Sequence, residues 1–113
     1  MDKYWEKYSM EKWGKNIYQD AIDEWGENAQ FDQLIEEMAE LTVALSKYKR
    51  LAYDNMLGKP KEKIFDNLFE EIADVKMMIE EMEYIFGKEK VDEWYDKKMK
   101  KFMLELYGPE SNK

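Results

Sequence analysis

The sequence predicts an all-α protein, and two observations carry that prediction. Between the glycines and the two prolines, Pro60 and Pro109, apolar residues recur at three- and four-residue spacing, which is the period of helices. The sequence has no sustained alternation of apolar and polar residues, the pattern that marks strands. The 113 residues, 44% of them hydrophobic, suit a single domain, which we expect to span residues 1–113.

Glycine and proline divide the chain into four expected helices. We expect a short helix over about residues 15–25, long helices over about 29–54 and 61–86, and a last helix over about 89–106. Gly87 stands where a left-handed residue would end the second long helix. Short connections between such helices favour an antiparallel, four-helix-bundle-like fold.

The short helix and the segments outside the helices complete the expected organisation. Residues 1–14 are an N-terminal extension without an assigned role, residues 55–60 a loop, and residues 109–113 a loose tail. The eight tyrosines and four tryptophans exceed what a small core needs, so we expect some of them at a subunit interface. The short helix is expected to direct four apolar residues toward a core: Ile17, Ala21, Ile22 and Trp25.

Composition removes several classes of function. The chain has no cysteine and no histidine, which excludes disulfides, zinc–thiolate sites and histidine acid–base chemistry. Any metal would be a hard cation held by oxygen, such as Mg²⁺, Mn²⁺ or Ca²⁺. The net charge of −8 argues against a nucleic-acid partner. With no apolar run of about 20 residues and no signal-like start, we expect a cytoplasmic protein without a membrane partner.

Two carboxylates interrupt the apolar stripes of the long helices. Glu37 falls in the middle of the first stripe and Glu71 in the middle of the second, with Glu40 and Asp74 three residues further on. The first stripe consists of Gln30, Leu34, Glu37, Leu41, Ala44, Tyr48 and Leu51. The second consists of Ile64, Leu68, Glu71, Val75, Met78, Met82 and Ile85.

Position, and not spacing, distinguishes these carboxylates from the others. Acidic pairs at i,i+3 spacing are common in the chain, and most of them belong to solvated helix faces. A buried, unpaired carboxylate costs several kcal/mol or shifts its pKa until it is neutral. Neither stripe carries a lysine near Glu37 or Glu71. We therefore expect Mg²⁺, or Mn²⁺, between the two helices, held by Glu37, Glu40, Glu71 and Asp74.

Two segments resemble the EExxE…ExxD signature of the MazG-like all-α nucleoside triphosphate pyrophosphatases. They read EEMAEL over residues 36–41 and EEIADV over residues 70–75. The flanking sequences WGENAQ, ALSKYKR and KKMKKF also resemble family segments, so the resemblance covers about residues 15–106. The chain departs from the family in a long gap between the two motifs and in the missing arginine of its last basic stretch.

The resemblance implies a fold, an activity and a set of residue roles. It implies a MazG-type bundle, assembled as a homodimer or homotetramer, that hydrolyses a nucleoside or deoxynucleoside triphosphate between the α- and β-phosphates. Glu37, Glu40, Glu71 and Asp74 would be the metal ligands, and Glu36 and Glu37 the catalytic carboxylates that activate water. The implied substrate-binding residues are Gln30, Lys47, Arg50, Asn67, Lys97, Lys100 and Lys101.

Two other interpretations of the sequence stay open at this point. The chain could be a bundle that binds Ca²⁺ or Mg²⁺ for stability and catalyses nothing. It could also be a non-catalytic helical interaction protein with solvated acidic faces. The last reading explains the composition but gives no reason for a glutamate in the middle of each apolar stripe.

Overall fold

The structure, a computed structural model, describes residues 16–54 and 61–109 of the chain. Within those ranges every regular element is helical, which confirms the all-α prediction. The expected N-terminal extension, the loop at 55–60 and the tail beyond 109 lie outside the described residues. The chain divides into two compact units between Glu80 and Glu81, and each is described by itself below.

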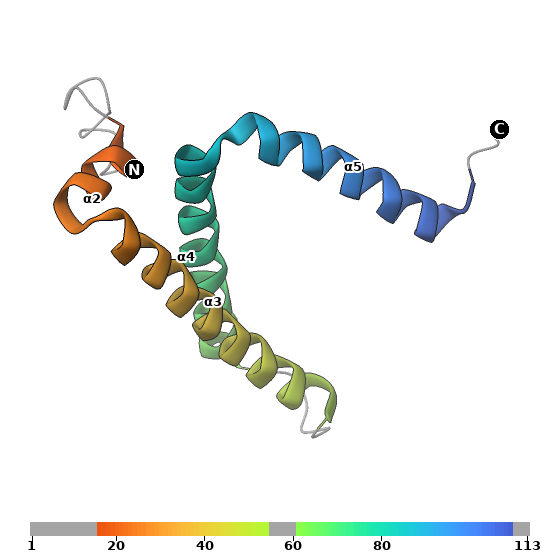
Figure 1. Cartoon of the computed structure of the whole chain (residues 1–113). Coiled ribbons are helices and arrows are strands. Elements are labelled where there is room, and N and C mark those ends of the chain that lie inside the picture. Colours follow the sequence, from red (N-terminus) through yellow and green to blue (C-terminus); the bar gives the residue numbers. More distant parts are fainter. Residues whose placement is uncertain (1–15, 55–60, 110–113) are drawn as a thin grey trace, which may run out of the picture. The chain divides into compact units, whose positions relative to one another are not determined.

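The helices follow one another with short connections (Figure 1). All four expected helices are present, each with its ends within about two residues of the prediction except at the end of the first long helix. The bounds are Ile17–Trp25 for α2, Glu27–Lys49 for α3, Arg50–Asp54 for the π-helical turn η2, Glu62–Phe86 for α4 and Lys88–Tyr107 for α5.

The turn between α2 and α3 is a single residue, Gly26. Asn16 caps the start of α2, because its side-chain oxygen accepts a 2.7 Å hydrogen bond from the Tyr18 backbone N–H. Gly26 has φ of +91°, which is costly for residues with a Cβ. Its N–H donates to Ile22 O at 2.8 Å, and its own carbonyl accepts from Gln30 N at 3.3 Å. One glycine therefore ends α2 and starts α3.

The end of the first long helix differs from the prediction. The α-helix stops at Lys49, and the chain continues as a π-helical turn from Arg50 to Asp54. Lys49 Nζ lies 3.1 Å from Asp54 Oδ2, an ion pair that spans five residues and so matches the i,i+5 period of this turn. Periodicity of apolar residues could not reveal the change, because one widened turn shifts the register only locally.

Helices α3 and α4 form an antiparallel hairpin within the first unit. Near one end the rings of Tyr48 and Phe65 meet edge to face, with centroids 5.4 Å apart. Further along, carboxylate oxygens of Glu37 lie close to those of Glu71 and Asp74. Residues of α3 therefore meet residues of α4 in reverse order, which confirms that these two helices are antiparallel.

Burial within the hairpin follows the predicted stripes. Ala44, Leu68 and Met78 are its most buried apolar residues, at 3%, 9% and 6% exposure. Every other predicted stripe member is buried or half-buried, including both glutamates. The stripe prediction is therefore confirmed on both helices, and Glu37 and Glu71 do occupy positions that an apolar side chain would ordinarily fill.

The predicted apolar face of the short helix is only partly correct. Ala21 and Ile22 are half-buried, whereas Ile17 and Trp25 are 60% and 66% exposed. Both exposed residues lie at the ends of the nine-residue helix, at its first and last positions. The expectation that Trp25 belongs to the core is therefore wrong. The Tyr18 hydroxyl instead links α2 to α4, since it donates to Glu80 Oε1 at 3.0 Å.

The second unit contains the end of α4 and all of α5. Gly87 ends α4 as predicted, and its N–H donates to Glu83 O at 2.8 Å. Its φ of +113° is positive, but its ψ of 109° places it outside the left-handed helical region that was expected. No helix in the described parts of the chain is both long enough and apolar enough to span a bilayer.

Candidate metal centre

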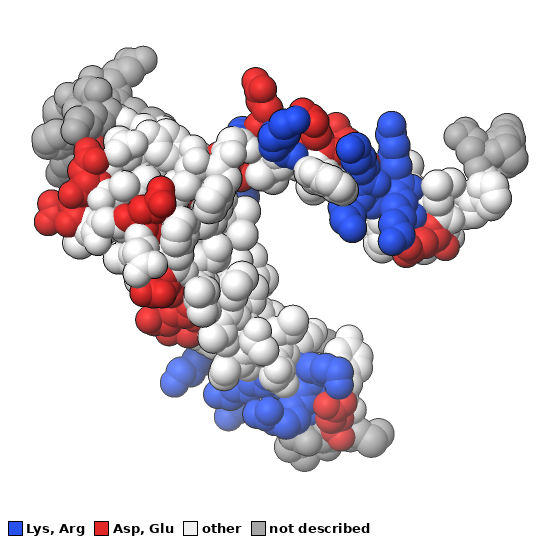
Figure 2. Space-filling view, in the orientation of Figure 1, with Lys and Arg blue, Asp and Glu red and all other residues white. Residues whose placement is uncertain are grey.

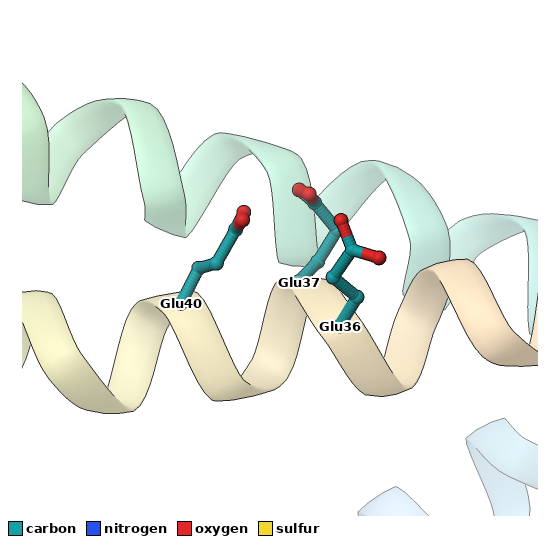
Figure 3. Close-up of side chains that lie close together, drawn as sticks. All are labelled: Glu36, Glu37 and Glu40. Atoms are coloured by element: carbon teal, nitrogen blue, oxygen red, sulfur yellow. The ribbon is translucent and has the colours of Figure 1, made fainter.

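Helices α3 and α4 bring the four predicted carboxylates together near the middle of the hairpin. One carboxylate oxygen from each of Glu37, Glu71 and Asp74 lies within 4.8 Å of the others. A second group of three, joining Glu40 and Glu36 to Glu37, meets the same limit. Figure 3 shows these three glutamates rising from α3 on the side that faces α4. Glu37 belongs to both groups and is the centre of the cluster.

The surroundings of Glu37 favour the neutral form of its carboxyl. Burial raises the pKa of its carboxyl from 4.5 to about 7, helped by hydrogen bonds to Glu40 and Asp74 and by the charges of both. Its side chain is 9% exposed, so little water reaches it. Gln33, one turn earlier on α3, donates from Nε2 to Glu37 Oε1 at 3.4 Å. A proton shared among carboxyls compensates part of the negative charge when no cation is present.

Glu71 carries the clearest sign of a missing partner. Burial raises the pKa of its carboxyl, followed by the negative charges of Glu40, Asp74 and Glu70. Its Oε1 atom is buried and accepts no hydrogen bond from any residue in the described ranges. Buried polar atoms are almost always satisfied, so an orphaned carboxylate oxygen in a native fold needs an explanation.

The four carboxylates are not neutralised by lysine or arginine from the described parts of the chain. The ion pairs found there join Lys49 to Asp54, Lys88 to Asp92 and Lys90 to Glu93, all on exposed surfaces. Four acidic groups at this separation repel one another unless protons or a cation intervene. A divalent cation bound between these carboxylates would remove that repulsion.

The donor set fits a hard divalent cation. Mg²⁺ binds oxygen at about 2.0–2.1 Å in octahedral geometry, so neighbouring and opposite ligand oxygens lie about 3–4 Å apart. The carboxylate oxygens of Glu37, Glu71 and Asp74 already lie within 4.8 Å of one another, and Glu71 Oε1 is unsatisfied. Small side-chain movements would bring them to coordination distance, with Glu40 able to join from α3.

Glu36 lies at the exposed edge of this cluster. Its side chain is exposed, in contrast to that of Glu37, yet its carboxylate belongs to the group formed with Glu37 and Glu40 (Figure 3). A carboxylate with one side toward the cluster and the other toward solvent can accept a proton from a water molecule near the ligands. Its position is compatible with the predicted catalytic role.

Two predicted substrate-binding residues lie in the same hairpin as the carboxylates. Gln30 is 7% exposed and lies on the buried stripe of α3, two turns before Glu37. Asn67 is exposed and lies on α4, one turn before Glu71. Both are amides and can exchange hydrogen bonds with a heterocyclic base.

Lys47 and Arg50 lie away from the carboxylates. Lys47 is exposed and follows Glu40 by seven residues, a helical rise of about 10 Å, and Arg50 is three residues further still. Figure 2 shows lysine and arginine gathered at the end of the hairpin where α3 ends and α4 begins. The structure thus groups these two residues with each other and with Lys49, but it does not bring them into the carboxylate cluster.

Lys97 and Lys101 belong to α5 in the second unit. Both side chains are exposed, as is that of Lys100 between them. Lys97 Nζ lies 4.6 Å from the centre of the Trp94 ring, a cation–π contact that the sequence analysis did not anticipate. Lys97 thus has a partner within α5. The contact of Lys97, Lys100 and Lys101 with phosphates stays a prediction.

Two further residues near the cluster carry no clear signal in the sequence. Gln33 supports Glu37 through the hydrogen bond already described, and the only sequence signal is its position four residues earlier. Glu81 is 2% exposed, and burial raises the pKa of its carboxyl. It follows Asp74 by seven residues, so it continues that side of α4, but no acidic residue lies three positions before or after it to mark it in the sequence.

The fold and the cluster together define an all-α carboxylate site suited to a divalent cation. Comparisons with protein-family models, with curated proteins and with solved structures found no match for this chain. The carboxylate cluster and the two motifs are therefore the features of this chain that bear on its function.

Proposed function

We propose that this protein is a Mg²⁺-dependent nucleoside triphosphate pyrophosphatase of the MazG-like class. The observation that carries the proposal is the buried cluster of Glu37, Glu71 and Asp74, with an orphaned oxygen on Glu71 and no cationic partner in the described residues. The motifs EEMAEL and EEIADV, each on one of the paired helices, support the assignment to this class.

The proposed reaction is hydrolysis between the α- and β-phosphates, which yields a nucleoside monophosphate and pyrophosphate. A triphosphate brings about four negative charges, which the acidic hairpin would repel on its own. Mg²⁺ or Mn²⁺, held by Glu37, Glu40, Glu71 and Asp74, would supply charge neutralisation and a more acidic bound water. Phosphoryl transfer needs mainly positioning and charge stabilisation, so a site without histidine or cysteine is adequate.

The chain's own residues have separate tasks in this proposal. Glu37 and Glu71 hold their carboxylates in a site shielded from bulk water, because both occupy the buried stripes. Glu36, at the exposed edge, orients the attacking water and accepts its proton. Gln30 and Asn67 contact the base, and Lys97, Lys100 and Lys101 contact the β- and γ-phosphates. Lys47 and Arg50 would need a substrate that extends along α3 from the cluster.

The wider biology belongs to the same proposal. The resemblance favours a cytoplasmic protein that removes unwanted nucleotides, with either ribose or deoxyribose in the substrate. It also favours a homodimer or homotetramer. None of these features follows from the carboxylate cluster itself, so each requires its own measurement.

A structural, non-catalytic cation site is an alternative that is supported by the same observation. The orphaned oxygen of Glu71 is satisfied equally well by a cation that only stabilises the hairpin. Pyrophosphate release separates the two, because a structural cation raises the melting temperature without turnover.

The experiment mixes the protein and Mg²⁺ with a panel of nucleoside and deoxynucleoside triphosphates and measures pyrophosphate. We expect release by the wild type and a loss of at least about 100-fold in Glu71→Gln, since a ligand carboxylate is removed. Glu62→Gln is the matched control, because Glu62 lies exposed on the same helix and outside the cluster. Absence of release from every substrate, with Mg²⁺ still raising the melting temperature, would favour the structural alternative.

A further inference from the structure

We infer that the terminal phosphate of the substrate binds at Lys47 and Lys63, two turns from the carboxylates on the same side of the α3/α4 hairpin. The inference rests on the proposed function and adds the direction of the phosphate chain and a reason to prefer a triphosphate. Lys63 is not among the substrate-binding residues that the resemblance implies. We call this side of the hairpin the carboxylate flank. On α3 it comprises Glu36, Glu40, Val43 and Lys47, and on α4 it comprises Lys63, Asn67, Glu70 and Asp74.

The two rows of the carboxylate flank lie on one side of the hairpin. Each member comes one position before a member of the buried stripe, as Glu36 precedes Glu37. One residue turns an α-helix by about 100°, so both rows point roughly at right angles to the buried contact. Seen from one end, antiparallel helices wind in opposite senses, so the same step leads toward the same side on both. Glu40 and Asp74, one from each row, both form hydrogen bonds with Glu37, which supports this placement.

Members of the two rows lie at matching levels along the hairpin. The ring contact and the carboxylate cluster described above set the register of α3 against α4. With this register Glu40 lies at about the level of Glu70, and Lys47 at about the level of Lys63. On each helix seven residues separate the glutamate from the lysine, a rise of about 10 Å. The carboxylate flank therefore has an acidic part and, two turns further on, a basic pair with one lysine from each helix.

Neither lysine of the basic pair has a carboxylate partner among the described residues. The ion pairs found there use Lys49, Lys88 and Lys90 instead. No acidic residue lies three or four positions from Lys47, the spacing at which ion pairs form on a helix. Figure 2 shows the basic side chains at this end of the hairpin apart from the acidic ones further along it. Lys47 and Lys63 are both exposed and are thus available to an anion.

The order of charges along the carboxylate flank fits a divalent cation followed by a phosphate chain. Phosphate oxygens near the carboxylates would be ligands of the cation, so those phosphates need no lysine. The phosphate furthest from the cation still carries negative charge, which a pair of ammonium groups neutralises through charge-assisted hydrogen bonds. A cation that only stabilised the hairpin would give no reason for a basic pair on the same side.

The separation of the two parts suits a triphosphate. A lysine carries its ammonium on a flexible four-carbon stem, which spans about one helical turn, or about 5 Å. Side chains lean toward the N-terminus of their helix, so Lys47 leans toward the carboxylates and Lys63 away from them. Lys47 is therefore the closer contact. The remaining turn corresponds to the length of two phosphates beyond the cation, so a monophosphate held at the cation does not reach the pair.

The stretch between the carboxylates and the lysines is open within the first unit. Val43 lies there on α3 and is 68% exposed, and Asn67 lies at the same level on α4 and is exposed too. A phosphate chain along this stretch passes Asn67, whose amide can donate to a phosphate oxygen as well as to a base. In this orientation the base lies toward Gln30, which precedes the carboxylates on α3.

The test measures binding to the full chain by isothermal titration in the presence of Mg²⁺. The probes are α,β-imido nucleoside triphosphates, which the proposed reaction cannot cleave, and the corresponding monophosphates. In the double variant Lys47→Gln/Lys63→Gln we expect the affinity for the tightest-binding triphosphate analogue to fall at least about 10-fold, because charge-assisted contacts are lost. The affinity for the monophosphate should change less than about 2-fold, since screening weakens charges at that separation.

The chain offers a matched control on the same two helices. Lys49 and Lys61 each lie two positions from a member of the pair, or about 160° around the helix. Lys49→Gln/Lys61→Gln makes the same change of charge away from the flank and should bind both ligands as the wild type does. Lys47→Arg/Lys63→Arg keeps the charge on the flank and should retain most of the affinity. Far-ultraviolet circular dichroism checks that each variant stays helical.

The outcomes separate this inference from the proposed function. Equal affinity of the wild type and Lys47→Gln/Lys63→Gln for the triphosphate analogue would overturn the inference, while pyrophosphate release by the wild type would leave the proposed function intact. An equal loss in Lys49→Gln/Lys61→Gln would also overturn it, because net charge and not position would then explain the loss. Absence of nucleotide binding by the wild type would overturn both. If the double variant loses helicity, the single variants Lys47→Gln and Lys63→Gln replace it, and unchanged affinity in both overturns the inference.

Discussion

At the scale of single residues, Glu37 is the group most perturbed by the fold. It occupies an apolar position, shares hydrogen bonds with Glu40 and Asp74, and has a pKa raised to about 7. Burial of a carboxyl that is half-protonated near physiological pH lowers the stability of the fold. The same property suits a site in which protons are exchanged for a cation.

The raised pKa of Glu37 predicts how stability depends on pH without metal. In the unfolded chain this carboxyl titrates near 4.5, whereas in the folded chain it titrates near 7. Between these values the folded state binds more protons, so the free energy of unfolding decreases as pH rises. We expect the melting temperature of the metal-free protein to fall by at least about 5 °C from pH 4.5 to pH 7. Glu37→Gln should flatten this dependence, and an equally steep profile in that variant would refute the assignment.

Removal of the charge at Glu71 gives a second prediction at this scale. Its Oε1 is buried without a partner in the described residues, so Glu71→Gln should raise the melting temperature of the metal-free protein at pH 7.5. The same variant should lose the increase that Mg²⁺ causes in the wild type. Differential scanning fluorimetry measures both effects. Destabilisation of the metal-free protein by this change would indicate that the glutamate has a favourable partner.

At the scale of helices, the two buried stripes determine which side chains stabilise the hairpin. Met77 and Met78 are neighbours on α4, but Met78 is 6% exposed and Met77 is 54% exposed. We expect Met78→Ala to lower the free energy of unfolding by about 2–4 kcal/mol. Met77→Ala should change it by less than about 1 kcal/mol. Urea denaturation measures both, and equal losses would mean that the stripe does not define the hairpin contact.

The stripes also explain how much of the fold could be predicted from sequence. The positions of Leu68, Ala44 and the interrupting glutamates follow from a period of 3.6 residues, which persists over helices more than 20 residues long. Trp25 could not be placed in this way, because angular position does not determine burial at the end of a short helix. The π-helical turn after Lys49 also left no trace in the apolar pattern.

The candidate site was predictable for a related reason. Burial of a carboxylate is unfavourable enough that its presence in an apolar stripe is informative, and both Glu37 and Glu71 were found in this way. Residues that assist without breaking the pattern, such as Gln33 and Glu81, carry no comparable signal. The rise from Glu40 to Lys47 follows already from the helix expected over 29–54, whereas the π-helical turn that begins at Arg50 does not follow from the sequence.

At the scale of the whole molecule, the proposed cation site belongs to a chain with a net charge of −8, which attracts cations over a longer range than the site itself. Because dissolved salt screens this longer-range attraction, we expect the affinity for Mg²⁺ to fall as the ionic strength rises.

The central claim is that the cluster of Glu37, Glu71 and Asp74 holds a divalent cation, and isothermal titration with Mg²⁺ near pH 7 tests it most directly. The titration is run in two buffers of different ionisation enthalpy, so that protons released from the Glu37 carboxyl are counted. The account predicts saturable binding with proton release in the wild type and in Glu62→Gln, and neither in Glu71→Gln. Absence of saturable binding in the wild type, or equal binding in all three proteins, would contradict it.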